Sequence, residues 1–317
     1  MITRRKYAEE KINEWDEFVK FSNASTLHSS RKFLNYHQKK FNDSSLMFYQ
    51  NNHLVGVLPG VIKEKTYISH PGASYGGLIY KEGLKINYLF EIHEQILNFC
   101  RENGVCKLEF RFPYSIISKH YYDAYKYILN NHPSTVYKEV SQFIDLLKFK
   151  DKNYFSENFT RIIKKNSELI TSVTKNYNDI ENFYNILSEN LIKHSTKPTH
   201  ELSELNYLIE NLDEKVLLFV TKDSNSNIVS GSLAIQLNNE TSHLFYLGTN
   251  IEYLSYSPLV NTVHDVAKYF KSENFRFLNL GISTESKGST LNSGLNNFKE
   301  KFNTSATSRE TIVVDIK

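Results

Sequence analysis

The chain has 317 residues, of which 40% are hydrophobic and 23% are charged, and its formal net charge is +3. This composition is typical of a globular protein and excludes a largely disordered one, and the slight net charge disfavours a dedicated nucleic-acid binder. A chain of this length exceeds the usual size of one hydrophobic core, so we expect two domains.

The first half of the chain predicts helices and a sheet built from hairpins. Apolar side chains at helical spacing alternate with β-prone segments that turn residues separate, among them an Asn-Asn turn at 51–52. Helices are predicted over 12–22, 29–41 and 86–104, and strands within 46–71, 71–80 and 105–112.

The second half repeats this order of helices, strands, helix and strand. Helices are predicted over 156–169, 178–194 and 257–275, three strands within 215–250, and a further strand over 276–283. Two halves with one order of elements indicate a duplicated fold, although their sequences barely resemble each other.

A change of composition near residue 150 places the expected domain boundary. The segment there is polar, so we predict an N-terminal domain of 1–149 and a C-terminal domain of 150–308. The last residues alternate apolar and polar side chains as a strand does, and we expect 309–317 to join the N-terminal domain. The predicted fold class is α/β (α+β), with a mixed sheet flanked by helices in each domain and a cleft between the domains.

The sequence also predicts where the protein works. Residues 1–15 lack the apolar segment of a signal peptide, and no run approaches the ~20 apolar residues that span a bilayer. Cys100 and Cys106 do not form a CxxC motif, which favours a reducing compartment. We expect a soluble, cytoplasmic protein without a membrane partner, and the sequence leaves homo-oligomerisation open.

Several familiar catalytic motifs are missing. The chain has no GxGxxG after a strand, no GxxxxGK[ST], no HExxH and no GxSxG. This disfavours hydride transfer, ATP cleavage and zinc proteolysis, and we expect no metal ion.

Three histidines are candidates for contact with a substrate. His194 and His200 flank Pro198 in a polar segment after a predicted helix. A histidine titrates near neutral pH and could take a proton from an attacking ammonium group, so both are candidate catalytic residues; a hydrogen-bonded loop histidine is the alternative. His28, just before a predicted helix, is a candidate substrate-binding residue.

Four further residues are candidate substrate-binding residues. Arg161 shares a helix face with two lysines, which could hold a phosphate, although such a face is more often only solvated. Tyr246 and Asn250 lie at the end of a strand next to a glycine, where a ligand can approach closely. Tyr75 lies in the glycine-rich segment 71–80.

The order of segments resembles a known family. The stretches IVSGSLAIQ, LFYLGTN, YSPLVNTVHDVAKYF, FRFLNLGIS and GLNNFKEKF resemble the FemABX-like branch of the GNAT superfamily, and NASTLHSSRKFL, VGVLPGVI and PGASYGGLIY resemble its N-terminal domain. Members carry two tandem GNAT-like domains and transfer acyl or aminoacyl groups to amines. The family usually has Gly where Asn303 stands, and Asn also tolerates the left-handed conformation.

The resemblance suggests a site at the C-terminal FK segment. The family uses the lysine of this motif near the acyl-transfer centre, which implies a catalytic role for Lys299. Phe298, the residue before it, is a candidate substrate-binding residue. A cation there would stabilise the oxyanion of acyl transfer, whereas the alternative is a surface lysine. Ser283 and Asn292, in the polar loop before this segment, are candidates to bind phosphate or carbonyl oxygens.

The long helical arm of several tRNA-dependent relatives has no room in this chain. The pattern is most similar to that of nucleotide-sugar N-acyltransferases without the arm. The resemblance therefore implies that an acyl group passes from acyl-CoA to the amine of a nucleotide-linked amino sugar, for cell-surface polysaccharide synthesis. Coenzyme A, as acyl-CoA, is the only cofactor expected. Two alternatives stay open: Fem-type aminoacyl transfer from tRNA to a peptidoglycan precursor, and a non-catalytic module that binds a sugar or peptide.

Overall fold

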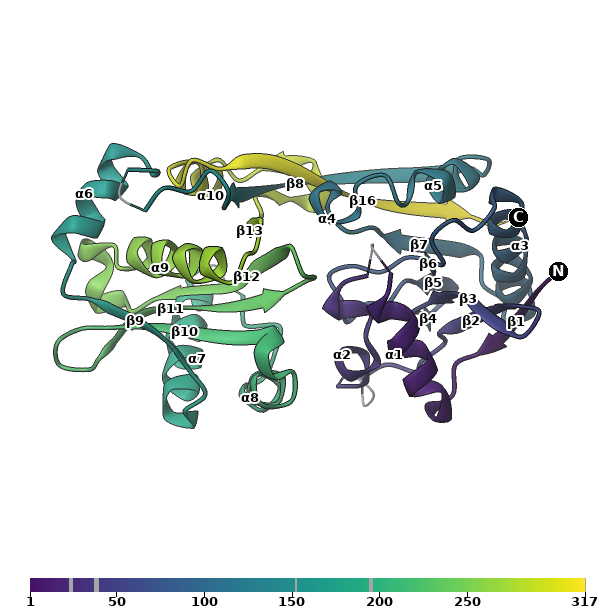
Figure 1. Cartoon of the computed structure of the whole chain (residues 1–317), viewed down its shortest axis with the longest axis horizontal. Coiled ribbons are helices and arrows are strands. Elements are labelled where there is room, and N and C mark those ends of the chain that lie inside the picture. The colour runs from purple at the N-terminus through teal and green to yellow at the C-terminus, as the bar shows by residue number, and fades with distance from the viewer. Residues whose placement is uncertain (23–24, 37–39, 152, 194–195, 317) are drawn as a thin grey trace. The chain divides into compact units, whose positions relative to one another are not determined.

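The chain forms two compact units, each with its own hydrophobic core (Figure 1). The computed structural model describes residues 1–22, 25–36, 40–151, 153–193 and 196–316. The first unit comprises Met1–Glu139, Ser286–Ser289 and Ser308–Lys317, and the second comprises Val140–Glu285 and Thr290–Thr307. The units divide at 139/140, within strand β8 (Ser134–Asp145), whereas the expected boundary lies at 149/150.

A four-stranded antiparallel sheet occupies the N-terminal part of the first unit. Its strands, in spatial order, are β1 (Ile2–Lys6), β2 (Leu46–Gln50), β3 (His53–Leu58) and β6 (Ile79–Tyr80). Asn51 and Asn52 join β2 to β3 with φ values of 49° and 63°. Asparagine tolerates this left-handed conformation, which the two-residue hairpin turn requires.

The first unit contains a second, mixed set of strands. Strand β4 (Val61–Lys63) pairs antiparallel with β5 (Thr66–Ile68), and β5 pairs parallel with β7 (Lys107–Arg111). The last strand of the chain, β16 (Ser305–Asp315), pairs antiparallel with β7 from Thr311 to Asp315. Its apolar side chains, Ile312 and Val314, therefore belong to the core of the first unit.

The helices of the first unit cover these strands. They are α1 (Ile12–Lys20), α2 (Arg31–Asn35), α3 (Ile86–Glu102), α4 (Ser115–Ser118) and α5 (Asp123–Leu129), with 3₁₀ turns η1 (Glu9–Lys11) and η2 (Leu27–Ser29). Helix α2 is shorter than the predicted 29–41. The side chain of Ser30 caps it by accepting from the amide of Phe33, and the helix ends at weak helix formers, Asn35 and Tyr36.

The second unit is built on a mixed sheet. Its strands, in spatial order, are β8 (Ser134–Asp145), β13 (Phe277–Ile282), β12 (Thr241–Thr249), β11 (Ile228–Gln236), β10 (Val216–Lys222) and β9 (Ile170–Thr174). The β12–β13 pair is parallel and the others are antiparallel.

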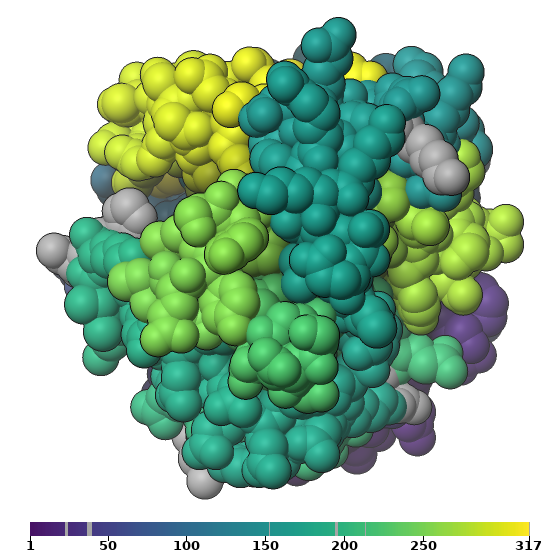
Figure 2. Space-filling view, turned by 90° about the vertical axis from the view of Figure 1, so that its left-hand side faces the viewer, coloured from purple at the N-terminus to yellow at the C-terminus, as the bar shows by residue number. Residues whose placement is uncertain are grey.

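Helices cover both faces of this sheet: α9 (Leu259–Ser272) lies on one face, and α7 (Tyr177–Ile192) and α8 (Leu202–Asn211) lie on the other (Figure 1). Helix α6 (Glu157–Lys165), in teal, lies at the surface of the unit (Figure 2). The remaining elements are α10 (Ser293–Glu300), the hairpin β14 (Thr284–Glu285) and β15 (Thr290–Leu291), and 3₁₀ turns η3 (Asp213–Lys215), η4 (Ile251–Tyr256) and η5 (Ser286–Gly288). In the described part of the chain, no helix has both the length and the apolar character needed to cross a bilayer.

Candidate active site at Lys299

The parallel strands β12 and β13 pair for only part of their length. Backbone pairing joins 241–243 to 277–279 and then ends, although both strands continue. On the other side of β12, Leu233 pairs with Tyr246 and Ala234 with Leu244, so Phe245 is the extra residue of a bulge. A bulge bends its strand. Beyond 243 and 279, the two strands therefore present backbone groups that are not bonded to each other.

Lys299 on α10 reaches the end of β13 in this region. Its side chain is only 3% exposed, and its Nζ donates to the carbonyl oxygens of Gly281, at 2.8 Å, and Ile282, at 2.7 Å. Gly281 has a φ of 79°. Glycine adopts this conformation at little cost and leaves no side chain beside the ammonium.

The sequence around Lys299 holds α10 against the second core. Phe298 packs edge-on against Phe302 with ring centroids 5.2 Å apart, and Phe302 packs against Phe159 at 4.6 Å. Asn303 then takes a left-handed conformation with a φ of 53°, which confirms that it can replace the usual glycine at this turn. The lysine between two phenylalanines is thus buried by the packing of its neighbours.

The protonation of Lys299 is set by its burial. Burial lowers its pKa from the usual 10.5 to about 7. The two carbonyls favour the ammonium form, but loss of water outweighs them because no carboxylate among the described residues pairs with Lys299. Near neutral pH the side chain therefore exchanges between charged and neutral forms.

A polar network without a carboxylate fixes the carbonyl of Gly281. Asn279 accepts a hydrogen bond from the Gly281 amide through Oδ1, at 2.9 Å, and its Nδ2 donates to Ser141 Oγ at 3.0 Å. Ser141 Oγ in turn donates to the Gly281 carbonyl at 2.7 Å. The buried imidazole of His243 contacts Asn279 Oδ1 through Nδ1, at 2.9 Å. This network holds one of the two acceptors of Lys299 without adding a formal carboxylate charge.

Aromatic rings extend from this network along β12. The ring centroids of His243 and Phe245 are 6.0 Å apart, and those of Phe245 and His200 are 5.4 Å apart. His200 is 6% exposed and its Nδ1 lies 2.8 Å from the hydroxyl of Tyr246. Burial raises the pKa of Tyr246, so its hydroxyl stays protonated. The structure thus brings two of the predicted residues, His200 and Tyr246, into contact.

Ser283 and Asn292 are used to position α10. The Asn292 amide donates to the Ser283 carbonyl at 2.9 Å, and Asn292 Oδ1 accepts from the Leu295 amide as the helix cap. Ser283 is buried, and its Oγ donates to Gln142 Oε1 at 2.6 Å. The Asn292 side chain thus caps the helix that carries Lys299, and its backbone amide ties the start of this helix to Ser283, just after β13.

The other predicted residues lie elsewhere in their units. Asn250 caps η4 and lines a polar groove with residues of α7. Arg161 is on an exposed face of α6. His28 and Tyr75 are both buried in the first unit, with ring centroids 5.2 Å apart. His194 lies outside the described residues.

Sequence reasoning missed the residues around Lys299. Ser141, His243, Asn279 and Gly281 carry no motif of their own, and each lies within or beside a hydrophobic strand sequence. The one available signal was polar or glycine residues inside buried strands, at Asn279 and Gly281 in FLNLGIS. Among the residues described, no cluster of three or more His, Cys, Asp or Glu side chains could hold a metal ion.

Comparison with known proteins identifies a family whose model matches this chain. The model of the FemAB family matches residues 137–309. A search of curated protein sequences finds no significant match.

Solved structures share the fold over nearly the whole chain. FemX superposes with a TM-score of 0.70 at 11% identity, over 97% of this chain and 96% of that one. L-PGS from Bacillus licheniformis gives 0.62 at 11% identity, over 99% and 93%. A tandem GNAT protein from the clavulanic acid biosynthesis pathway gives 0.56 at 9% identity, over 100% and 99%. These likenesses confirm the predicted fold class, with two GNAT-like domains of mixed sheet and helices.

Proposed function

The chain belongs to the FemAB family, and we propose that it is an N-acyltransferase that uses Lys299 to stabilise the transition state of amide formation. We further propose acyl-CoA as the donor and a nucleotide-linked amino sugar as the acceptor. The fold shared with tandem GNAT proteins supports a thioester donor.

The third N–H of Lys299 is the observation that carries this proposal. An ammonium group has three donors, and the carbonyls of Gly281 and Ile282 accept two of them. No described residue accepts the third. A carbonyl oxygen that gains negative charge during acyl transfer would accept it, in a site where burial strengthens the interaction.

The reaction would proceed by direct attack. The neutral amine of the acceptor attacks the thioester carbonyl, forming the C–N bond and a negatively charged oxygen beside Lys299. Collapse of this intermediate breaks the C–S bond, and the thiolate takes the proton that the amine loses. Orientation of donor and acceptor can supply much of the rate enhancement, so a strong general base is not required.

A second candidate function is aminoacyl transfer from an aminoacyl-tRNA to a peptidoglycan precursor. The family match over residues 137–309 favours it. The same centre would serve this chemistry, because an ester carbonyl develops the same oxyanion and only the leaving group differs.

Donor assays distinguish the two candidates. Purified protein is incubated with a panel of acyl-CoAs and amino-sugar nucleotides, and thiol release is measured together with the N-acylated product. We expect thiol release that depends on both substrates, and saturable thermal stabilisation by CoA at millimolar concentration. Product formed only with aminoacyl-tRNA would overturn the proposed donor, and no product with either donor would overturn acyl transfer.

A further inference from the structure

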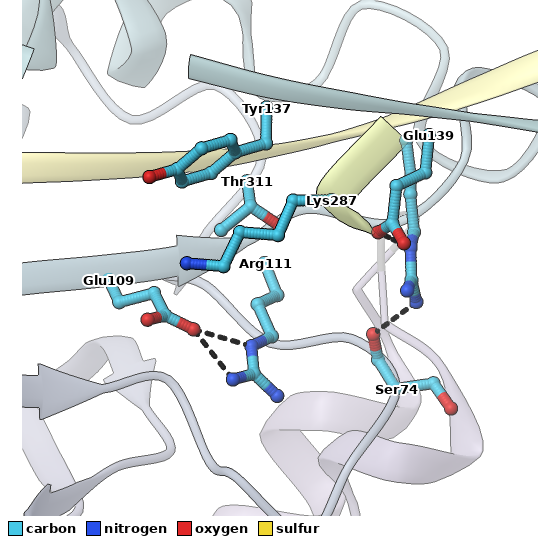
Figure 3. A pocket seen from close by; sticks show the side chains of 8 residues that line it. Ser74, Glu109, Arg111, Tyr137, Glu139, Lys287 and Thr311 are labelled. Carbon is cyan, nitrogen blue, oxygen red and sulfur yellow. Dashed lines mark hydrogen bonds and ion pairs between the residues drawn. The ribbon is translucent and has the colours of Figure 1, made fainter. Parts of the chain in front are cut away.

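The first unit contains a pocket of about 300 Å³ in which charged side chains face one another (Figure 3). Its walls come from β7, the middle of β16, β8, the tip of the β14–β15 hairpin and the loop that carries Ser74. The lining residues are Ser74, Glu109, Arg111, Tyr137, Glu139, Lys287, Arg309 and Thr311. All eight belong to the first unit, so the pocket is complete within it.

Both arginines of the pocket are paired with glutamates. Arg111 contacts Glu109 Oε1 through Nε at 2.7 Å and Nη2 at 2.6 Å. Arg309 donates from Nε to Glu139 Oε2 at 2.7 Å, and from Nη1 to the Ser74 carbonyl at 3.1 Å. Each guanidinium therefore carries a neutralising carboxylate.

Lys287 is the third cation, and it makes no ion pair with any residue in the described ranges. Its Nζ lies 4.7 Å from the centre of the Tyr137 ring, and its side chain extends between Tyr137 and the Glu109–Arg111 pair (Figure 3). The side chain is exposed, so burial does not explain its position.

The backbone that carries Lys287 is held in an uncommon conformation. Ser286 and Lys287 have φ values of 49° and 57°, which cost free energy in residues with a side chain. The next residue, Gly288, lies so close to β8 that a Cβ there would be 1.8 Å from the Lys138 carbonyl oxygen. The tip is thus fixed against β8 with Lys287 directed over the pocket. Strained backbone of this kind often occurs at ligand sites.

The charges of the pocket select for a particular ligand. Three cations (Arg111, Lys287 and Arg309) face two carboxylates (Glu109 and Glu139), which leaves one positive charge. The glutamates would repel a diphosphate, whereas a single carboxylate would neutralise Lys287. The volume is near the lower end for ligand pockets and admits one amino-acid residue or one sugar ring.

We propose that this pocket binds the carboxylate of an amino acid, peptide end or sugar acid, with the carboxylate on Lys287 and Arg111. Glu109 then lies on the side where a neighbouring ammonium or hydroxyl group of the ligand would donate. This inference concerns the first unit alone and does not rest on acyl transfer at Lys299.

Binding measurements test the proposal on the full chain. Glycylglycine and glucuronate are titrated in turn and followed by calorimetry or NMR, with glycinamide, glucose and pyrophosphate as comparison ligands. We expect one carboxylate probe to bind with a Kd of about 1–10 mM, and the probe that binds identifies a peptide or a sugar-acid ligand. Lys287→Gln should weaken this binding about ten-fold, since it removes a charged donor.

Lys63→Gln provides the matched control, because Lys63 is an exposed lysine of the same unit outside the pocket. It should leave the Kd unchanged. The proposal is overturned if pyrophosphate binds more tightly than both carboxylates, if glycinamide or glucose binds as well as the acids do, if neither acid binds, or if both lysine variants behave alike.

Discussion

The two candidate sites of this protein hold their cationic side chains in opposite environments, one with carboxylate partners and one without. In the first unit, Arg111 and Arg309 each pair with a glutamate. Burial works against the charge of Arg309, but Tyr114 and the Glu139 carboxylate outweigh it and raise the pKa of that guanidinium. In the second unit, Lys299 donates to two carbonyls and pairs with no carboxylate of the described residues, and burial lowers its pKa to about 7.

The difference lies in what each region can do with its charge. A guanidinium paired with a carboxylate keeps its charge and can orient an anion. Because the carboxylate already neutralises that charge, the guanidinium stabilises new negative charge in a transition state only weakly. A buried ammonium with one unused donor gains most when negative charge appears beside it, which is the condition for catalysis. Asn279 and Ser141 hold the Gly281 carbonyl that accepts from Lys299, and neither side chain adds a negative charge that would neutralise the ammonium.

Removing the ammonium should produce the largest effect. Lys299→Ala should lower kcat roughly 100- to 1000-fold, the loss of about 2.7–4 kcal/mol seen for one oxyanion donor, with a much smaller change in KM. Lys301→Ala, an exposed lysine two residues later, is the control and should keep near-normal turnover. Initial rates with donor and acceptor varied separately check this. Normal turnover in Lys299→Ala would make Lys299 a structural residue.

Replacing the lysine with an apolar side chain should stabilise the fold. Burying an unneutralised ammonium costs free energy, so Lys299→Met should raise the free energy of unfolding by about 1–3 kcal/mol at pH 6. The pKa of Lys299 is about 7 in the folded protein and 10.5 ordinarily. Between these two pH values the unfolded wild type binds more protons than the folded wild type, so the free energy of unfolding of the wild type rises with pH. The advantage of the variant should therefore shrink from pH 7 to 10 in urea unfolding. A constant or growing advantage would argue against a depressed pKa.

A carboxylate introduced near Lys299 should make the second region resemble the first. Asn279→Asp adds a negative charge to the network that holds Gly281, so the pKa of Lys299 should rise and the limb of the pH–kcat profile that reports its deprotonation should move to higher pH. Ser141→Ala removes a hydrogen bond to the same carbonyl without adding charge, and should lower kcat several-fold without moving that limb as far. Identical profiles in both variants would show that charge is not the controlling difference.

His200, the histidine that contacts Tyr246 of β12, should matter least. His200→Ala removes the contact with Tyr246 but leaves Lys299 in place, so we expect a few-fold rise in the acceptor KM and measurable turnover. Tyr246→Phe removes the same hydrogen bond while keeping the ring and should reproduce the effect. Complete loss of turnover with unchanged KM values would instead identify His200 as a general base.

The sequence predicted the periodic elements well and the site only in part. Helices such as α3 and α9, and the strands β10 to β12, follow directly from apolar spacing. Strand β8 was missed because its first half is largely exposed and contains Lys138 and Glu139, and β9 because it is a short, largely exposed edge strand. The positions of β8 and β9 depend on the strands with which they pair, and those strands are distant in the sequence.

Lys299 was predicted from an FK segment and a family resemblance, whereas its network was not. Ser141 and Asn279 are far apart in the sequence, and their hydrogen bond exists only because β8 and β13 are neighbours. Asn292 and Ser283 are predicted ligand contacts; in the structure Asn292 caps α10, and its amide donates to the Ser283 carbonyl. A polar loop has one composition whether it binds a ligand or a helix, so composition could not separate the two roles.

The protonation of Lys299 is the most direct test of this account. An NMR titration of the protein with ¹³C-labelled lysine, with Lys299→Met to assign the resonance, measures its pKa in the folded state. We predict a midpoint near the value of about 7 that burial causes. A Lys299 resonance that titrates near the usual 10.5 would contradict the claim that this ammonium is desolvated and free of a neutralising partner.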